Sequence, residues 1–182
     1  MDSERRTERL TLVPGTTDHI RAEIDSPKKL GSLLGADVPG DWPPGEYDPK
    51  AREFFLDRME AAEASARGWF VWYAILRGGA GERPVVIGTG GFLGPPGPNG
   101  DVEIGYSVSE AWRGRGLGRE IVEGLVHAAL DDPRVTRILA HTAVDNAASR
   151  SILDGAGFSA AGPGAEPGTI RFELNRRGED VS

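Results

Sequence analysis

The chain has 182 residues, no cysteine, and a formal net charge of -7 from 28 acidic and 21 basic side chains. Without cysteine it forms no disulfide or thiolate metal site, and its acidity excludes the surplus of Lys and Arg on which non-specific nucleic-acid binding depends. No apolar run approaches the roughly 18 residues of a membrane-spanning helix, so we expect a cytoplasmic protein that binds neither membrane nor nucleic acid.

Strand and helix patterns alternate along the first half of the chain. Three helix starts are marked by the capping residues Thr16 or Thr17, Ser26 and Asp48, and proline follows the last two. A proline-rich loop at 36–48 precedes the third helix, whose apolar residues repeat at helical spacing as far as Ala66. In chain order, the predicted elements are a strand at 10–13, helices at 17–24, 27–34 and 49–66, and strands at 69–76, 84–93 and 101–108.

The second half is predicted to hold a helix at 116–130, a strand at 135–144, a short helix from Asn146 to about Gly157, and a last strand at 169–174. The strand at 101–108, the helix and the strand at 135–144 form a βαβ unit, so these two strands are expected to be parallel with a right-handed crossover. We predict one α/β domain over residues 1–182, with flexible ends at 1–8 and 176–182.

A short segment between the strand at 101–108 and the next helix combines glycine with arginine. Its residues are Arg113, Gly114, Arg115, Gly116, Leu117, Gly118 and Arg119. Glycine lets a backbone turn tightly and approach a ligand, and a helix N-terminus adds unpaired N–H groups and the positive end of the helix dipole. The segment is therefore predicted to bind an anion, in particular a phosphate group.

The spacing of this segment excludes two common phosphate loops. A P-loop ends in Gly-Lys-Ser/Thr, whereas this segment ends in Gly118-Arg119-Glu120. A dinucleotide fingerprint needs Gly-x-Gly-x-x-Gly in the first βα turn, but these glycines fall at every second position in mid-chain. An enzyme that binds a nucleotide phosphate here in another way stays an alternative.

The string from Arg113 to Gly118 fits Arg/Gln-x-x-Gly-x-Gly/Ala and resembles the acyl-CoA loop of the GNAT superfamily of N-acetyltransferases. The stretch 140–149, followed by Gly157-Phe158, is similar to the fifth strand and following helix of that family, with its Asn-x-x-Ser. The segments 10–13 and 103–106 resemble the ribosomal-protein (Rim-type) branch. The resemblance covers roughly residues 9–175 in the expected order.

The resemblance implies a GNAT-like mixed sheet of six to seven strands with helices on both faces, and acetyl-CoA bound as co-substrate between two splayed parallel strands. It implies transfer of an acetyl group to a primary amine by direct attack in a ternary complex. The acceptor is a protein N-terminus or a small-molecule amine, and the oligomeric state is open between monomer and homodimer. By the same resemblance, the coenzyme contacts are the whole segment from Arg113 to Arg119, the backbone of Val108, and Asn146 and Ser149.

Two residues are candidates for the chemistry. Glu103 lies on the strand face opposite the apolar row, where the resemblance places a general base, although an ion-paired strand glutamate fits the same pattern. Ser149 is a candidate near the leaving thiolate, because Leu153 stands where many relatives carry tyrosine. That missing tyrosine keeps open a non-catalytic acyl-CoA sensor on the same fold.

The remaining polar residues point to no metal, since His, Asp and Glu are not grouped at metal-ligand spacing. His141 is expected either to face the cleft or to form a hydrogen bond on the sheet. The acceptor site should involve the proline-rich loop and the early helices, where Trp42, Tyr47 and Trp72 are candidate walls.

Overall fold

The computed structural model describes residues 3–45, 47–63 and 66–176, which form a mixed eight-stranded sheet and five α-helices. The strand order is β1-β2-β3-β4-β5-β6-β8-β7. In chain order the elements are β1 (Arg5–Arg6), β2 (Leu10–Pro14), α1 (Thr17–Asp25), α2 (Pro27–Leu34), α3 (Pro49–Ala61), β3 (Val71–Leu76), β4 (Val85–Phe92), β5 (Asp101–Val108), a 3₁₀ helix (Glu110–Trp112), α4 (Leu117–Leu130), β6 (Arg137–Ala143), α5 (Ala147–Gly155), β7 (Ser159–Pro163) and β8 (Thr169–Asn175).

The expected mixed sheet is present, but it has eight strands where six or seven were predicted. One unpredicted strand is β1, which pairs with β2 inside the segment expected to be a flexible end. The other is β7, an edge strand whose sequence Ser-Ala-Ala-Gly-Pro has no apolar alternation to reveal it. Residues 1–2 and 177–182, also expected to be flexible, lie outside the described residues.

The predicted helix caps are confirmed, but the predicted end of the third helix is wrong. The side chains of Thr16, Ser26 and Asp48 each accept a hydrogen bond from a backbone N–H in the first turn of their helix. The third helix, α3, ends at Ala61, because Ala62 already has an extended backbone. Ala66 continues the apolar repeat in sequence but is buried in a turn outside the helix.

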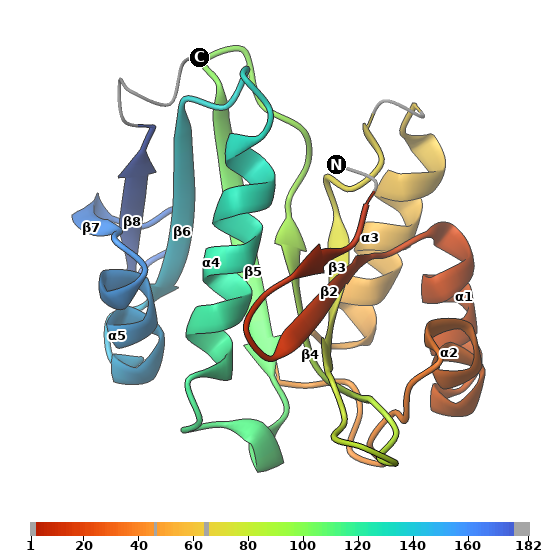
Figure 1. Ribbon diagram of the computed structural model, residues 1–182. Helices are drawn as coiled ribbons and strands as arrows, with labels where there is room; N and C mark the ends of the chain where they lie inside the picture. The colour runs from red at the N-terminus through yellow and green to blue at the C-terminus, as the bar shows by residue number, and fades with distance from the viewer. Residues whose placement is uncertain (1–2, 46, 64–65, 177–182) are drawn as a thin grey trace.

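Helices cover both faces of the sheet, as expected (Figure 1). Alternate residues of β3 point into two separate cores, with Trp72 on one side and Tyr73 on the other. The first core includes the apolar faces of α4 and β5, and the second packs beneath α1, α2 and α3. The α4 side is built from long apolar side chains such as Leu125, whereas the α3 side also buries aromatic hydroxyl groups.

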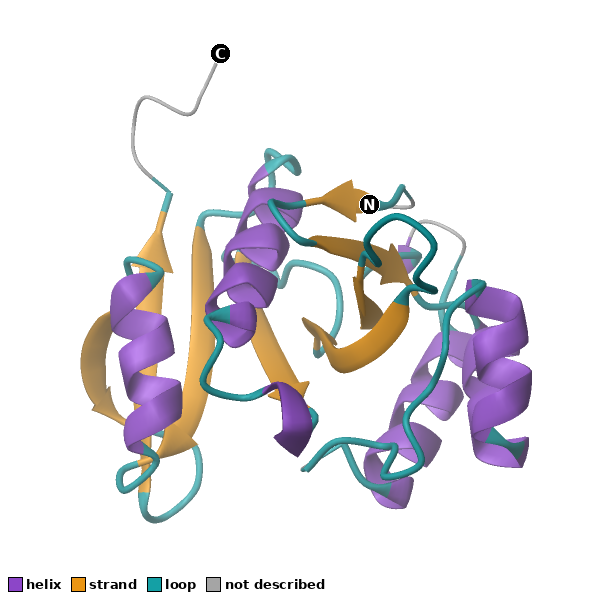
Figure 2. Cartoon of the chain, turned by 60° about the horizontal axis from the view of Figure 1, so that its bottom comes forward, coloured by secondary structure: helices purple, strands orange, loops and turns teal. Residues whose placement is uncertain are grey.

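The two parallel strands separate partway along their length. β5 and β6 are in register from Asp101 opposite Arg137 to Ile104 opposite Ala140. Beyond that point β5 stays paired with β4 as far as Val108, while β6 stays paired with β8. Figure 2 brings forward this end of the molecule, where β5 and β6 end and α4 begins. The carboxyl ends of two diverging parallel strands therefore lie beside a helix N-terminus, which is the usual position of a ligand in such sheets.

Candidate active site

The glycine–arginine loop adopts a backbone that glycine favours. Gly114 and Gly116 have φ values of 72° and 77°, in the left-handed region where a side chain is strained. Gly116 is the N-cap of α4 and has no side chain to bond the first amides of the helix. A Cβ atom built on Gly114 would meet no atom within 4 Å. The loop thus leaves open space beside Gly114, close to the N-terminus of α4, while an added Cβ on Gly116 would approach the Arg9 guanidinium to 3.4 Å. An open backbone next to a helix N-terminus and an arginine fits a phosphate group.

Leu117 and Gly118, the two residues of the predicted loop that belong to α4, contribute to helix packing. Leu117 is buried in the core on the α4 side. Gly118 lies within α4, and a Cβ there would approach Ile152 of α5 to 2.9 Å. Gly118 therefore permits the close contact of α4 with α5, and any contact of Leu117 or Gly118 with a ligand must come from the backbone.

The three arginines of the loop each have a partner within the chain. Arg113 donates from Nε to the carbonyl oxygen of Val108 at 2.9 Å. Arg115 lies over the ring of Trp112, 5.0 Å from its centroid, and Arg119 pairs with Glu123 at 2.7 Å. All three arginines are exposed. Because these partners leave most guanidinium donors free, the arginines keep their capacity for phosphate.

Arg9 also reaches this loop, although no spacing in the sequence indicates that contact. Its guanidinium donates from Nη1 to the carbonyl oxygen of Arg115 at 2.8 Å and from Nε to Glu120 at 2.8 Å. Glu120 is 7% exposed and also accepts hydrogen bonds from the backbone N–H groups of Arg9 and Leu10. The start of β2 is thereby tied to the loop and to the first turn of α4.

The environment of Glu120 lowers its pKa. Burial acts against the charged form, but hydrogen bonds from Thr7 and Arg9 and the positive charge of Arg9 outweigh it. The folded-state pKa therefore lies below the unfolded value. Glu120 stabilises the fold above the unfolded pKa, and this contribution is lost as pH falls through the folded pKa.

We expect Glu120→Gln to lower the free energy of unfolding by about 2 kcal/mol near pH 7, because hydrogen bonds to a buried charged group contribute roughly 1.5–3 kcal/mol. The difference from the unmodified protein should narrow as the pH falls towards about 3. Urea unfolding at the two pH values measures both quantities. A difference of the same size at both would contradict the stabilisation by an ionised Glu120.

Glu103 and His141 come together across the separating strands. Nδ1 of His141 lies 3.0 Å from Oε1 of Glu103, and both project from the sheet face opposite the apolar row of β5. The Glu103 side chain is 33% exposed and that of His141 is 18% exposed. The carboxylate is thus oriented by a neighbour and still accessible to solvent. The sequence predicted either that His141 faces the cleft or that it forms a hydrogen bond on the sheet.

Ser149 lies beside the hydroxyl group of Tyr106. The sequence predicted for Tyr106 only a place in the apolar row of its strand. The hydroxyl groups of Tyr106 and Ser149 are 2.8 Å apart, and Tyr106 reaches from β5 to the first turn of α5. Burial raises the pKa of Tyr106, and the hydrogen bond with Ser149 offsets only part of that rise, so its hydroxyl stays protonated near neutral pH. Asn146 caps α5 by accepting a hydrogen bond from the Ser149 N–H at 3.0 Å, and Leu153 is buried in the core.

The backbone N–H of Val108 points into the gap between β5 and β6. Ser109 donates its N–H to Ile87 of β4 at 2.9 Å. Successive N–H groups along a strand point to opposite edges, so that of Val108 faces the other edge of β5, where β6 has already separated. This geometry suits a donor to a ligand oxygen in the gap.

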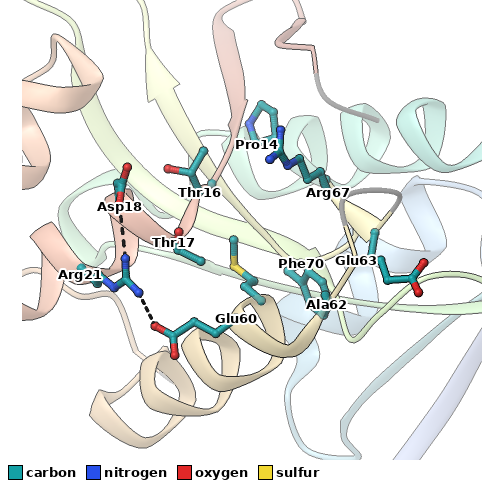
Figure 3. A pocket seen from close by; sticks show the side chains of 14 residues that line it. Pro14, Thr16, Thr17, Asp18, Arg21, Glu60, Ala62, Glu63, Arg67 and Phe70 are labelled. Carbon is teal, nitrogen blue, oxygen red and sulfur yellow. Dashed lines mark hydrogen bonds and ion pairs between the residues drawn. The ribbon is translucent and has the colours of Figure 1, made fainter.

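Two cavities lie on the α3 side of the sheet. The smaller has a volume of about 200 Å³ and borders β4, β5 and α3. The larger, about 830 Å³, lies between the N-terminal end of α1 and the C-terminal end of α3 (Figure 3). In it Arg21 bridges Asp18 and Glu60. Its described lining residues come from none of β5, β6, α4 and α5, so the larger cavity stands apart from the residues above.

No helix in the described ranges is long and apolar enough to cross a membrane. The described residues also contain no group of three or more His, Asp or Glu side chains arranged to bind a metal ion.

Comparison with known proteins gives consistent results. Residues 9–159 match the family model described as an acetyltransferase (GNAT) domain. The chain is 29% identical over 125 residues to YjdG of Bacillus subtilis (strain 168), named as an uncharacterized N-acetyltransferase, with 69% of this chain and 71% of that protein covered. It also resembles the solved structure of a ribosomal-protein-S5-alanine acetyltransferase from Vibrio fischeri, with 17% identity, a TM-score of 0.67, and 97% of this chain and 98% of the other covered.

A second solved structure with the same fold is the aminoglycoside acetyltransferase AAC(6')-Ib in complex with coenzyme A. Its identity is 22%, its TM-score is 0.60, and the match covers 92% of this chain and 95% of the other. At these identities the two structures establish the fold, while the family model establishes membership. The matched segment contains β2 to α5, including the glycine–arginine loop and both separating strands. The chain belongs to the acetyltransferase (GNAT) domain family.

Proposed function

We propose that the protein transfers an acetyl group from acetyl-CoA to a primary amine by direct attack in a ternary complex. The observation that supports this most strongly is the position of the glycine–arginine loop, at the N-terminus of α4 and beside the point where β5 and β6 separate. Anion-binding amides, the Val108 N–H, the Glu103 carboxylate and the hydroxyl groups of Tyr106 and Ser149 would then be available near the point where the two strands separate.

The residues present fit acetyl-CoA. The pyrophosphate would bind to the amides of 114–119 and to the exposed arginines of the loop. The N–H of Val108 and the first turn of α5, with Asn146 and Ser149, would line the gap for the rest of the coenzyme. When bound, acetyl-CoA supplies the acetyl group as an activated thioester.

The side chains then have distinct roles. A primary amine has an unperturbed pKa of roughly 8 to 10.4, so most acceptor molecules are protonated near neutral pH. Glu103, oriented by His141, takes the proton that the amine must lose. Val108 donates its N–H to the carbonyl oxygen on which negative charge develops. Of the hydroxyl groups of Tyr106 and Ser149, one donates to the other, and the remaining O–H proton donates at the position of the leaving sulfur.

The names of the structural neighbours support an amine acceptor, since they refer to a ribosomal-protein alanine and to an aminoglycoside. We place the activity in the cytoplasm, where a chain without cysteine needs no oxidising compartment. A non-catalytic acyl-CoA sensor is the competing function, favoured by the buried Leu153 at the position of the usual tyrosine. The paired hydroxyl groups of Tyr106 and Ser149 favour the enzyme instead.

The test combines two measurements on the purified protein. Acetyl-CoA should raise the melting temperature, and addition of primary amines should then release free thiol. Stabilisation by acetyl-CoA without turnover of any amine would favour the sensor. No stabilisation by acetyl-CoA together with stabilisation by nucleotides would contradict acetyl transfer.

A variant of the loop tests the same conclusion. Gly114→Val should weaken acetyl-CoA binding at least about tenfold, because a side chain at this φ is strained by roughly 1–3 kcal/mol and would occupy the open space beside the loop. Gly35→Val is the matched control. Gly35 is also exposed, has a φ of 63°, and has no atom within 4 Å of an added Cβ, but it lies at the end of α2. Calorimetric titration with acetyl-CoA should therefore separate the two variants, and equal affinities would exclude the loop from the binding site.

A further inference from the structure

We propose that the smaller cavity is the acceptor subsite and that it accepts a primary amine next to one compact apolar group, of the size of a phenyl ring or a branched alkyl chain. The inference rests on the proposed acetyl transfer and adds the chemical class of the acceptor. The same chemistry is offered by the N-terminal residue of a peptide and by a free arylalkylamine.

The cavity has an open floor of glycine backbone. Gly105 of β5 borders it, and a Cβ atom built on Gly105 would meet no atom within 4 Å. Gly90 and Gly91 of β4 also border the cavity, but an added Cβ would clash with Leu125 of α4 at Gly90 and with the carbonyl oxygen of Phe70 at Gly91, so Gly105 is the one of the three that faces open space. Glycine inside a strand weakens the sheet and marks places where a ligand approaches the backbone closely. The missing side chain at Gly105 is therefore what leaves room in the cavity.

The cavity is adjacent to the proposed base. Gly105 follows Glu103 on the same face of β5, and alternate residues of a strand lie roughly 7 Å apart. The separation of β5 from β6 begins directly after Ile104. An amine at the mouth of the cavity would thus lie between Glu103 and the gap that is proposed to hold the thioester.

The lining excludes an acceptor with several positive charges. Its described residues include no charged side chain, and aromatic and aliphatic groups predominate: Tyr47, Ala51, Val71, Phe55, Phe92 and Leu93. A second ammonium group placed here would lose its hydration without gaining a partner. Of the hydroxyl groups, that of Ser107 already donates to the carbonyl oxygen of Pro44 at 3.1 Å.

The size of the cavity limits the apolar group. Its volume of about 200 Å³ is below the roughly 300–1,000 Å³ of pockets that take drug-sized ligands. One wall is anchored, because the Tyr47 hydroxyl donates to Glu23 and the Tyr47 ring packs against Phe55 with centroids 6.4 Å apart. One ring or branched chain fits this space.

The experiment compares acceptors by free-thiol release at saturating acetyl-CoA. Phenethylamine and a peptide with N-terminal phenylalanine represent the two sources, and spermidine and kanamycin represent polycationic amines. At least one apolar acceptor should exceed both polycations at least tenfold in kcat/KM. Turnover of the peptide alone would assign the source to protein N-termini, and turnover of phenethylamine alone would assign it to small amines. A preference for spermidine or kanamycin would overturn the proposal.

Gly105→Val tests the cavity itself. The added side chain points into open space in a strand, so the fold should be retained, while the KM for the apolar acceptor should rise at least tenfold. Gly105→Ala should have an intermediate effect. Stabilisation by acetyl-CoA should not change in either variant, which distinguishes loss of the acceptor subsite from failure of the proposed activity. An unchanged KM in Gly105→Val would overturn the assignment of the cavity.

Discussion

Replacing Glu103 with glutamine is expected to slow acetyl transfer at saturating acetyl-CoA by about 100-fold, the lower part of the range for loss of a general base. Glutamine keeps the shape of the side chain and a partner for His141, but it cannot take a proton from the amine. The affinity for acetyl-CoA should stay within about twofold, because Glu103 is proposed to act on the acceptor alone.

The pH dependence makes this prediction specific. As pH rises towards the pKa of the acceptor amine, more of the amine is neutral and the base becomes less important. The rate deficit of Glu103→Gln should therefore shrink with rising pH. Glu173→Gln is the matched control, because Glu173 lies in the same cross-strand row and is paired with Arg137 and Arg171. Equal rates for Glu103→Gln and the unmodified protein would remove Glu103 from the mechanism.

The parts of the site that the sequence predicts are those encoded by contiguous residues. The glycines of the loop and the helix starts at Asn146 and Asp48 indicate the local backbone geometry. That geometry depends on residues that are neighbours in sequence. The fold followed from the βαβ pattern and the family resemblance, and the parallel pairing of β5 with β6 confirmed it. The strand β7 was not predicted, because its small residues show no alternation of apolar and polar side chains. A strand at the edge of the sheet does not require such alternation.

The parts that the sequence did not predict depend on residues far apart in the chain. Arg9 bonds to Glu120 across 111 positions, Tyr106 meets Ser149 across 43, and Glu103 meets His141 across 38. Each pair forms only when the sheet brings its strands and helices together, so neither member reveals the other by spacing. Of the cavity beside Gly105 the sequence predicted only the Tyr47 wall, since the other walls come from α3, β3 and β4 and meet only in the folded chain.

A buried carboxylate connects the proposed acceptor subsite with the stability of the protein. Glu23 of α1 is 2% exposed and accepts hydrogen bonds from Trp42 Nε1 at 2.5 Å, from the Tyr47 hydroxyl at 3.1 Å and from the Tyr73 hydroxyl at 2.8 Å. Burial raises the pKa of Glu23, and these hydrogen bonds offset only part of that rise. The carboxylate is therefore costly to bury, and its three donors keep it in place.

Of the expected acceptor walls, only Tyr47 lines the smaller cavity, while Trp42 donates to Glu23 and Trp72 lies in the core on the opposite face.

Glu23→Ala should accordingly lower the free energy of unfolding by about 3 kcal/mol, since it leaves three buried donors without an acceptor, each at a cost of roughly 1–3 kcal/mol before relaxation. For a protein of this size that corresponds to a fall in melting temperature of about 6–12 °C. Asp25→Ala on the same helix is the control, because Asp25 pairs with Lys29 at the exposed surface and should change stability by less than about 0.5 kcal/mol.

The stability and the KM for the acceptor should change together in Glu23→Ala. Loss of Glu23 frees the Tyr47 wall, so the KM for the acceptor should rise about tenfold below the melting transition. Acetyl-CoA should still bind, because the described lining of the smaller cavity includes no residue of the glycine–arginine loop or of α4. Tyr47→Phe keeps the ring and removes one hydroxyl, and should cost only about 1 kcal/mol with a smaller change in KM. Urea unfolding and acceptor kinetics measured on the same preparations test the link. A destabilised Glu23→Ala protein with an unchanged acceptor KM would show that the anchor supports the fold and not the acceptor wall.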